Sequence, residues 1–219
     1  MRRLDRSQIV EAALELLDAE GLSGVTTRKV AERLGVKSAS LYWHIRDREE
    51  LLDLLSDRIV ADARWPAASS GWREKVEGLM HEYLRCLLAH RDAARVAAGR
   101  PPAGPNRLRG AETLLGALLD ARLSELESID AGLVLTTYVV GFALEHQAAD
   151  TASVGEPRLD DDFLEAYPTL GRLAKVRPVT SSDRFGEGLR LILDGVEARI
   201  RASAPTGRGG RGRITVSSP

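Results

Sequence analysis

The N-terminal part of the chain begins with the apolar pattern of a short amphipathic helix. Apolar side chains recur every three or four residues over 7–20, and a glycine follows as a C-terminal stop. Thr26 and Thr27 offer N-caps for a second short helix. Ser38 offers one for a third helix over residues 39–45. Two short helices joined by a turn that contains a glycine make a helix-turn-helix.

Longer helical segments are predicted for the rest of the chain. Asp47 and Glu50 resemble a capping box that opens the next helix. Ser124 or Ser128 can cap a long apolar helix further on. The three prolines and the glycine of 100–106 must interrupt regular structure. Helices are predicted over 48–65, 72–90, 108–122, 130–150, 163–175 and 183–201, with an acidic loop at 151–162.

The chain is expected to be an all-α protein, because no valine-rich stretch alternates as a β-strand does. With 219 residues and 43% hydrophobic composition it can bury a core without disulfide bonds, and its single cysteine, Cys86, is interpreted as a buried structural thiol. No apolar signal segment follows Met1, and the uncharged stretch 131–144 is shorter than the ~20 residues of a membrane-spanning helix. A cytoplasmic protein is therefore predicted.

Charge is unevenly distributed, although the net charge is only −1. Residues 26–48 carry six Lys or Arg against two acids, whereas residues 49–203 carry a net charge of −6. A basic head in front of an acidic body suits a polyanionic partner such as nucleic acid. A solvated charged face is the alternative explanation.

The segment TTRKVAERLGVKSASLYWHIRDREELLDLL, residues 26–55, resembles the DNA-binding signature of the TetR family of repressors. The tetracycline repressor branch is similar in particular, because the RLD start, LYWH and then HRDAARV at 90–96 follow in the same order. The resemblance implies a helix-turn-helix DNA-binding domain at 1–47 and a helical ligand-binding and dimerisation domain at 48–203. It also implies a homodimer held by a four-helix bundle. The tail 204–219 has the Gly, Ser and Arg content of a disordered segment.

The function implied by the resemblance is a ligand-responsive repressor, which binds a near-palindromic double-stranded DNA operator and is released by a small-molecule effector. An activator or a ligand-independent regulator of the same fold is an alternative, and so is an RNA-binding adaptor that uses the Gly/Arg tail. An enzyme is disfavoured, because the chain has no Gly-x-Ser-x-Gly elbow, P-loop, dinucleotide glycine fingerprint or HExxH motif. No catalytic residue and no cofactor are assigned.

The third predicted helix is a candidate probe of the DNA major groove, because a helix fits that groove and presents side chains to the base edges. Arg28 is the best candidate for a bidentate guanine contact, and Lys37 can bind either a base or a phosphate. Packing of one ring between helices is the alternative for Tyr42 and for Trp43. Together with Lys37, the residues that the resemblance places against DNA are Thr27, Arg28, Ser38, Ala39, Ser40, Tyr42, Trp43, His44 and Arg48.

A second set of residues falls at positions that line the drug pocket in the tetracycline branch. For its apolar members, core packing is the alternative. Arg100 and Glu145 are the stronger candidates, because a charge inside a helical core is costly unless it pairs or meets a ligand, and a salt bridge between the two is their alternative. The body's histidines lack the spacing of a metal site. The set is Arg64, Met80, Leu84, Ala97, Arg100, Pro102 and Glu145.

The tetracycline branch holds a magnesium–tetracycline chelate through a histidine and a threonine just before its Arg-Pro turn, and through a glutamate of the partner chain. Alignment of HRDAARVAAGRPP places Ala97 and Arg100 at the first two positions. Neither a methyl group nor a guanidinium can ligate magnesium, so we expect no such chelate here. An anionic or carbonyl-rich effector is expected instead if Arg100 and Arg64 face the pocket. A solvated loop arginine is the alternative for Arg100.

The dimer interface is predicted on the helices at 130–150 and 183–201, because their apolar residues spread over more than one face. An arginine in place of Leu189 or Leu193 is expected to give folded monomers. Burial of these faces inside a monomeric core is the alternative.

Overall fold

Regular secondary structure is exclusively helical in the part of the chain that the computed structural model describes. The prediction of an all-α protein is therefore confirmed. The predicted tail at 204–219 lies outside that part, and so does the predicted acidic loop up to residue 160. The described residues are 4–66, 71–149, 161–173 and 181–203.

Local sequence signals set the ends of the first two helices. α1 (Arg6–Glu20) begins with a reciprocal capping box whose N-cap is Asp5. The Thr26 hydroxyl caps α2 (Thr27–Leu34), which ends at Gly35 with a φ of 65°. Because the capping residues lie next to the helices that they stabilise, both helices form where the pattern predicted them.

α3 (Ser38–Leu41) is shorter than the predicted third helix. Its N-cap is Lys37, and no side chain makes a capping bond there, so the prediction that Ser38 is the cap is wrong. After its last residue the chain makes a tight turn, in which the N–H groups of His44 and Ile45 both donate to the Leu41 carbonyl, at 2.8 and 2.9 Å. The aromatic pair of LYWH therefore lies in a turn, just beyond the end of α3.

α4 (Arg48–Ile59) leads from the head into the body, whose helices mostly agree with the predicted segments. α7 begins at Pro105, inside the predicted interruption, because proline lacks an N–H and fits the first turn of a helix. The short α6 was not predicted, and the segment near 163–175 forms two helices instead of one. The body helices are α5 (Trp72–Leu88), α6 (Ala93–Ala97), α7 (Pro105–Asp120), α8 (Glu125–Ala149), α9 (Asp161–Ala166), α10 (Pro168–Leu173) and α11 (Ser181–Ser203).

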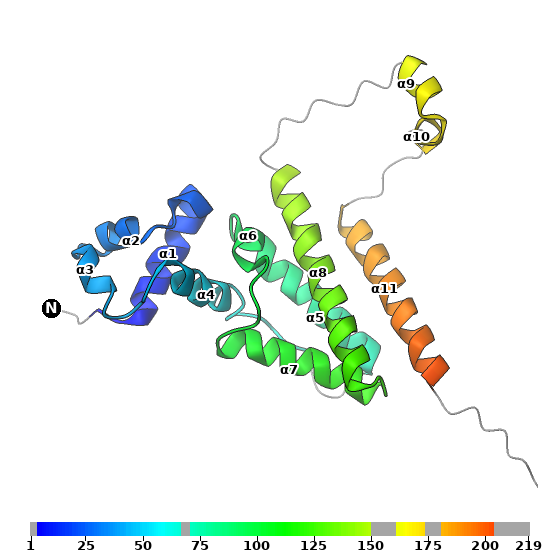
Figure 1. Ribbon diagram of the computed structural model, residues 1–219, viewed down its shortest axis with the longest axis horizontal. Coiled ribbons are helices and arrows are strands. Elements are labelled where there is room, and N and C mark those ends of the chain that lie inside the picture. The colour runs from blue at the N-terminus through cyan, green and yellow to red at the C-terminus, as the bar shows by residue number, and fades with distance from the viewer. Residues whose placement is uncertain (1–3, 67–70, 150–160, 174–180, 204–219) are drawn as a thin grey trace, which may run out of the picture.

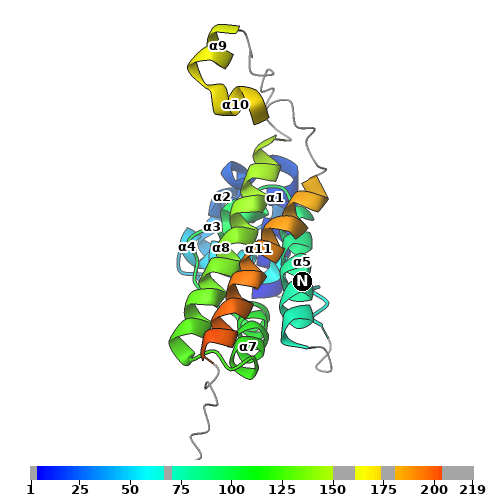
Figure 2. The same cartoon turned by 90° about the vertical axis from the view of Figure 1, so that its right-hand side faces the viewer.

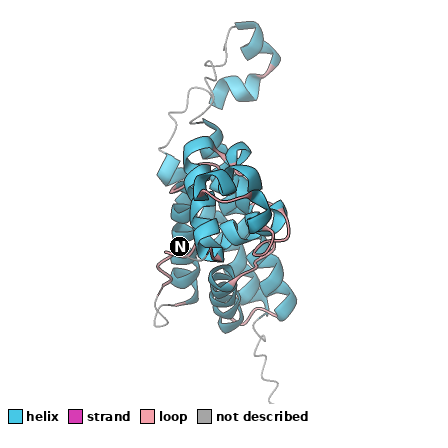
Figure 3. Cartoon of the chain, turned by 90° about the vertical axis from the view of Figure 1, so that its left-hand side faces the viewer, coloured by secondary structure: helices cyan, strands magenta, loops and turns pink. Residues whose placement is uncertain are grey.

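The head and the body occupy opposite ends of the molecule. Figure 1 shows α1, α2 and α3 at one end, with α4 leading into the layer formed by α5, α7 and α8. α11 lies beside α8 along the far side of the body, as Figure 2 shows face-on. Seen from the other side in Figure 3, the small helices of the head stand in front of the body. The chain thus presents α2 and α3 at one end and the α8–α11 pair at the other.

One apolar core runs from the head into the body. Its members range from Leu17 on α1, through Leu55 on α4, to Leu87 on α5 and Leu135 on α8, and all four are fully buried. Cys86 is buried as well, which agrees with its interpretation as a structural thiol. The head is therefore packed onto the body instead of being tethered by a flexible linker.

α11 contributes its apolar stripe to this core. Leu189 and Leu193 are both 0% exposed, so the prediction that they form the dimer interface is wrong. The outward side of the helix carries Leu191 instead, which is 75% exposed. Leu191 lies two residues from each, and two residues correspond to about 200° around a helix, so it points to nearly the opposite side.

α8 is long and apolar enough, by length and composition, to cross a membrane. It packs instead against α5, α6, α7 and α11, and Leu135, Val139 and Ala143 on its inner face are 0% exposed. Its apolar character is therefore that of a core helix with one additional exposed side.

Candidate functional site

The turn after α3 exposes the two aromatic side chains of the LYWH motif. Leu41 and Ile45, on either side of this pair, are 0% and 1% exposed and anchor the turn in the core of the head. Tyr42 is 56% exposed and Trp43 is 89% exposed, so neither ring packs between helices. Both rings are available to a partner at the outer end of the molecule.

Arg28 projects from the first turn of α2 into solvent. Its guanidinium donates to the Glu32 carboxylate at 2.8 Å, one helical turn away, and this hydrogen bond raises its already high pKa. The pair is exposed on both sides, and exposed pairs of this kind contribute little to stability. The arginine can therefore exchange Glu32 for a base edge or a phosphate at small cost.

Arg48 is part of the framework of the head. Its guanidinium donates to the backbone carbonyls of Val25 at 3.1 Å and Leu22 at 3.3 Å. It thereby ties the start of α4 to the chain that precedes α2. The other residues predicted to bind DNA lie on the same part of the head, with Lys37 and Ala39 exposed and Thr27, Ser38, Ser40 and His44 half-buried.

The positive charge of the head is partly neutralised within the molecule. Lys29 and Arg33 on α2 form ion pairs with Glu20 and Glu15 of α1. Arg46 pairs with Glu50 at 3.1 Å. The net positive charge of this segment along the chain therefore overstates the charge that the surface presents.

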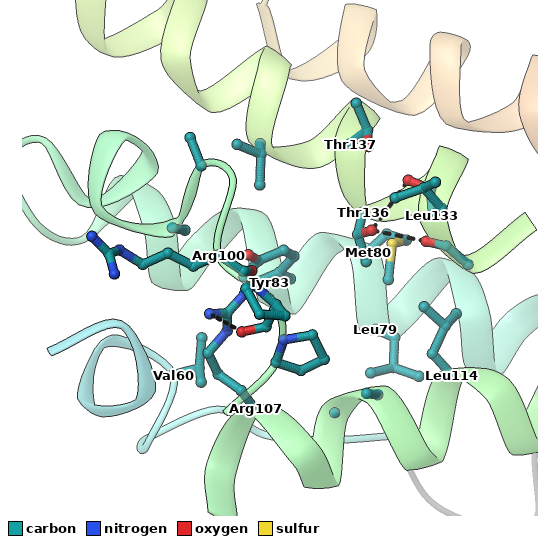
Figure 4. Close-up of a pocket in the computed structure, with 18 of the residues that line it drawn as sticks. Val60, Leu79, Met80, Tyr83, Arg100, Arg107, Leu114, Leu133, Thr136 and Thr137 are labelled. Atoms are coloured by element: carbon teal, nitrogen blue, oxygen red, sulfur yellow. Dashed lines mark hydrogen bonds between the residues drawn. The ribbon is translucent and has the colours of Figure 1, made fainter. Parts of the chain in front are cut away.

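A cavity of about 790 Å³ lies in the body, between α5, α7, α8 and the loop that follows α6. Its size is in the range of pockets that take drug-sized molecules. Figure 4 shows Leu79 and Met80 of α5, Leu114 of α7 and Leu133 of α8 converging on it. The wall is mostly apolar, and its polar or charged side chains are Tyr83, Arg100, Arg107, Thr136 and Thr137.

Four of the predicted ligand residues lie in the wall of this cavity, namely Met80, Ala97, Arg100 and Pro102. The other three do not line it. Arg64 and Glu145 are exposed, and Leu84 packs half-buried against the core. The structure thus gathers Met80 of α5 and the three predicted residues of the α6–α7 segment, and leaves the other three apart.

The guanidinium of Arg100 binds α4 on the side of the loop away from the cavity. It donates to the carboxylates of Glu49 and Asp53, each at 2.6 Å, and its side chain is 17% exposed. Neither a salt bridge with Glu145 nor a solvated arginine describes this residue. Figure 4 shows its charged end directed away from Met80 and Leu133, so it offers the cavity its backbone and aliphatic stem.

Arg107 and Tyr83 are the functional candidates that sequence analysis missed. Both line the cavity, Arg107 from the first turn of α7 and Tyr83 from α5. Arg107 was overlooked because the proline-rich interruption was expected to continue to residue 106, with the helix beginning only at Leu108. A proline at a helix N-terminus was the available signal, since it places the arginine two residues later in the first turn.

α4 is also fixed to α7 through a buried carboxylate. Asp57 is 8% exposed and accepts the backbone N–H groups of Asn106 and Arg107, at 2.9 and 2.8 Å. It therefore caps α7, whose own N-cap residue is a glycine, Gly104, with a φ of 84°. A Cβ at Gly104 would lie 2.5 Å from the Asp57 carboxyl carbon, so the close approach requires glycine.

The segment HRDAARV joins the body to the far end of α1. The Asp92 carboxylate accepts the Leu22 N–H at 2.8 Å, and Arg91 donates to the Ala19 carbonyl at 3.1 Å. His90 contacts the Asp18 carboxylate at 2.9 Å. The segments that flank the cavity wall thus hold the head at two places, at α1 and at α4.

Comparison with known proteins gives this geometry its context. Residues 9–55 match the family "Bacterial regulatory proteins, tetR family", and residues 65–200 match "Tetracyclin repressor-like, C-terminal domain". The tetracycline repressor protein class A of Escherichia coli is 34% identical over 203 residues, covering 91% of this chain and 93% of that protein.

Solved structures agree over the same length. ActR of Streptomyces coelicolor in complex with actinorhodin has a TM-score of 0.77 and 33% identity, covering 91% of this chain and 98% of ActR. BioQ, a Mycobacterium smegmatis protein, bound to its double-stranded DNA operator has a TM-score of 0.68 and 27% identity, covering 90% and 99%. The chain therefore belongs to the TetR family, as a non-enzymatic, ligand-responsive repressor of transcription that binds operator DNA.

Proposed function

We propose that the chain acts in the cytoplasm as a homodimer, which binds a near-palindromic operator and leaves it when a small molecule fills the cavity. Two identical heads related by two-fold symmetry would read two half-sites about one helical turn, ~10 bp or somewhat more, apart. We assign reading of DNA to residues 1–47 and ligand binding with dimerisation to residues 48–203. ActR with actinorhodin and BioQ with its operator support the two halves of this proposal.

The outer side of α8 and α11 is the surface that we assign to the dimer. Val134 on α8 is 52% exposed and Leu191 on α11 is 75% exposed. No described residue covers these two apolar side chains. A Cβ added at Gly195 on α11 would meet nothing within 4 Å, so a helix of a second copy can approach closely there. Two helices from each copy would give a four-helix bundle.

The observation that carries the proposed ligand response is the double attachment of α4. Arg100, in the loop that walls the cavity, binds Glu49 and Asp53, and α7, which forms another wall, is capped by Asp57. A ligand that shifts this loop or α7 must therefore move α4 or break these bonds. Because α4 continues directly from the DNA-reading turn, the separation and tilt of the two heads would change with it.

Selection of duplex DNA from a randomised pool with the purified full-length chain tests this proposal. The expected consensus is a near-palindrome whose half-sites are spaced by about one helical turn. Affinity for it should fall steeply with salt, since phosphate contacts release counterions. Enrichment of a single half-site, or no enrichment, would contradict the symmetric dimer.

A further inference from the structure

One charged side chain of the cavity has no acidic partner among the described residues. No aspartate or glutamate is among the residues that line the cavity. Of its two arginines, Arg100 is bound by two carboxylates of α4. Arg107 forms no ion pair with any acid in the described part of the chain. A cation in an otherwise apolar wall is costly unless something supplies the opposite charge.

The guanidinium of Arg107 is only partly satisfied by the protein. It donates to the backbone carbonyls of Arg100 at 2.9 Å and Pro101 at 3.1 Å. An arginine carries five N–H donors, so donors remain for a ligand beyond these two carbonyls and the hydrogen bond to the Tyr83 side chain. Figure 4 shows this side chain rising from α7 beside Tyr83, on the side of the cavity formed by the α6–α7 loop.

Tyr83 adds a second donor at the same place. Burial raises the pKa of its phenol, and the nearby Arg107 guanidinium opposes that rise only in part. The phenol therefore keeps its proton at neutral pH and can donate it. Thr136, on the opposite wall, donates its hydroxyl to the carbonyls of its own helix at 2.9 and 3.2 Å. The positive and proton-donating end of the cavity is thus the one that contains Arg107.

We propose that the effector is a largely apolar molecule with one anionic group, and that Arg107, assisted by Tyr83, binds that group. This inference rests on the proposed ligand response and names its chemical class. It moves the recognition of the anion from Arg100, whose guanidinium is bound to α4, to Arg107. The remaining wall, with Leu79, Met80 and Leu133, encloses the apolar part of the molecule.

Binding at Arg107 also has a route to the head. The carbonyls that its guanidinium holds belong to Arg100 and Pro101, the loop residues whose first member binds α4. A carboxylate that accepts bidentate bonds from Arg107 competes with these neutral carbonyls, because charge-assisted bonds are stronger. Release of the loop then loosens the contact of Arg100 with Glu49 and Asp53.

Two probes of matched shape test the inference with the full-length chain. Pyrenebutyrate carries a carboxylate, and pyrenebutanol has the same rings and chain with a neutral hydroxyl. We expect the wild-type chain to bind pyrenebutyrate about tenfold or more tightly than pyrenebutanol, measured by the change in pyrene emission. Arg107→Gln should remove this preference and leave the affinity for pyrenebutanol nearly unchanged.

Three further variants control the measurement. Arg109→Gln removes an exposed arginine of the same helix that does not line the cavity, and should keep the full preference. Arg107→Lys keeps the charge but loses the forked geometry of the guanidinium, and should keep part of the preference for pyrenebutyrate. Thr136→Trp fills the cavity from α8 without breaking a bond between helices, and should weaken the binding of both probes.

Several results would overturn the inference. These are equal affinity of the wild-type chain for the two probes, no binding of either, an unchanged preference in Arg107→Gln that melts like the wild type, or undiminished binding in Thr136→Trp. Operator binding without probe is measured separately on the same samples. If the wild-type chain binds its selected operator while the probes fail, only the ligand class is wrong; if it binds no DNA, the proposed function itself fails.

Discussion

The head and the body of this chain reach their functional geometry in different ways. In the head, short-range bonds set the ends of the first helices: Asp5 caps α1, and Thr26 caps α2. In the body, the cavity exists only because helices distant in sequence meet, as Asp57 of α4 does with the first turn of α7. The helix ends of the head therefore depend on neighbouring residues, whereas the cavity depends on tertiary packing.

Substitutions in the head and in the body should therefore act in different ways. A substitution on the exposed side of the head should remove one proposed contact with DNA and leave the fold intact. A substitution in the body alters packing, dimerisation or the connection to α4, according to which side of its helix it occupies. Adjacent positions of one helix can therefore have opposite consequences.

The largest expected effect separates the two sides of α11. Leu189→Arg buries a charge at a fully buried position and should cost several kcal/mol of unfolding free energy, enough to unfold much of the protein. Leu191→Arg, two residues later on the exposed side, should leave a folded monomer that binds the selected operator weakly. Urea melts and light scattering measure the two outcomes.

Leu108→Arg is the matched control, because Leu108 is an exposed leucine of α7 outside the α8–α11 surface. It should remain dimeric and bind the operator normally. A Leu191→Arg variant that is fully dimeric at micromolar concentration would contradict the assignment of the dimer surface.

The first helices of the head were predictable because the signals that end them are local. Capping residues and terminal glycines lie within a few positions of the helices they bound, so α1 and α2 follow from the sequence directly. α3 was predicted too long, because the apolar pattern continues through the turn that follows Leu41, where Ile45 is buried as well. α6 was missed because five residues hold too few apolar positions to show a period.

The cavity was predictable only in part. Family resemblance placed Met80, Ala97, Arg100 and Pro102, which line it, yet gave no direction for the side chain of Arg100. That direction depends on Glu49 and Asp53, some 50 residues earlier in the chain. Leu189 and Leu193 were assigned to the dimer because an apolar stripe does not reveal whether the chain itself or a second copy covers it.

Arg28 tests whether the head reads sequence or only charge. Arg28→Ala should reduce the discrimination between the selected operator and random DNA by ~1 to 3 kcal/mol if the side chain reads a base edge. The fold should be unaffected, since its partner Glu32 is exposed. Glu32→Ala controls for loss of the ion pair and should not weaken discrimination. Equal weakening on operator and random duplexes, measured by fluorescence anisotropy, would assign Arg28 to a phosphate.

The attachment of α4 by Arg100 should matter for the ligand response more than for stability. Arg100→Gln loses ion pairs with two partly exposed carboxylates, so we expect about 1 kcal/mol or less of destabilisation. Its affinity for the operator should change, because only the Asp57 cap of α7 then remains of the two polar attachments between α4 and the cavity wall. Arg109→Gln is the matched control. Operator affinity and ligand release identical to those of the wild type would rule out a role for this bond in coupling.

The smallest expected effect is that of magnesium on the binding of tetracycline. Ala97, at the position of the histidine ligand in the tetracycline branch, presents a methyl group to the cavity wall, and the guanidinium of Arg100 is turned to α4. Neither supplies the oxygen or nitrogen ligands that magnesium requires, so the heat of tetracycline binding should be the same with and without the metal. This prediction stands although the tetracycline repressors are similar along nearly the whole chain. Metal-dependent binding of submicromolar affinity in calorimetry would refute it, whereas such binding gained by Ala97→His would show that the two cavities are built in the same register.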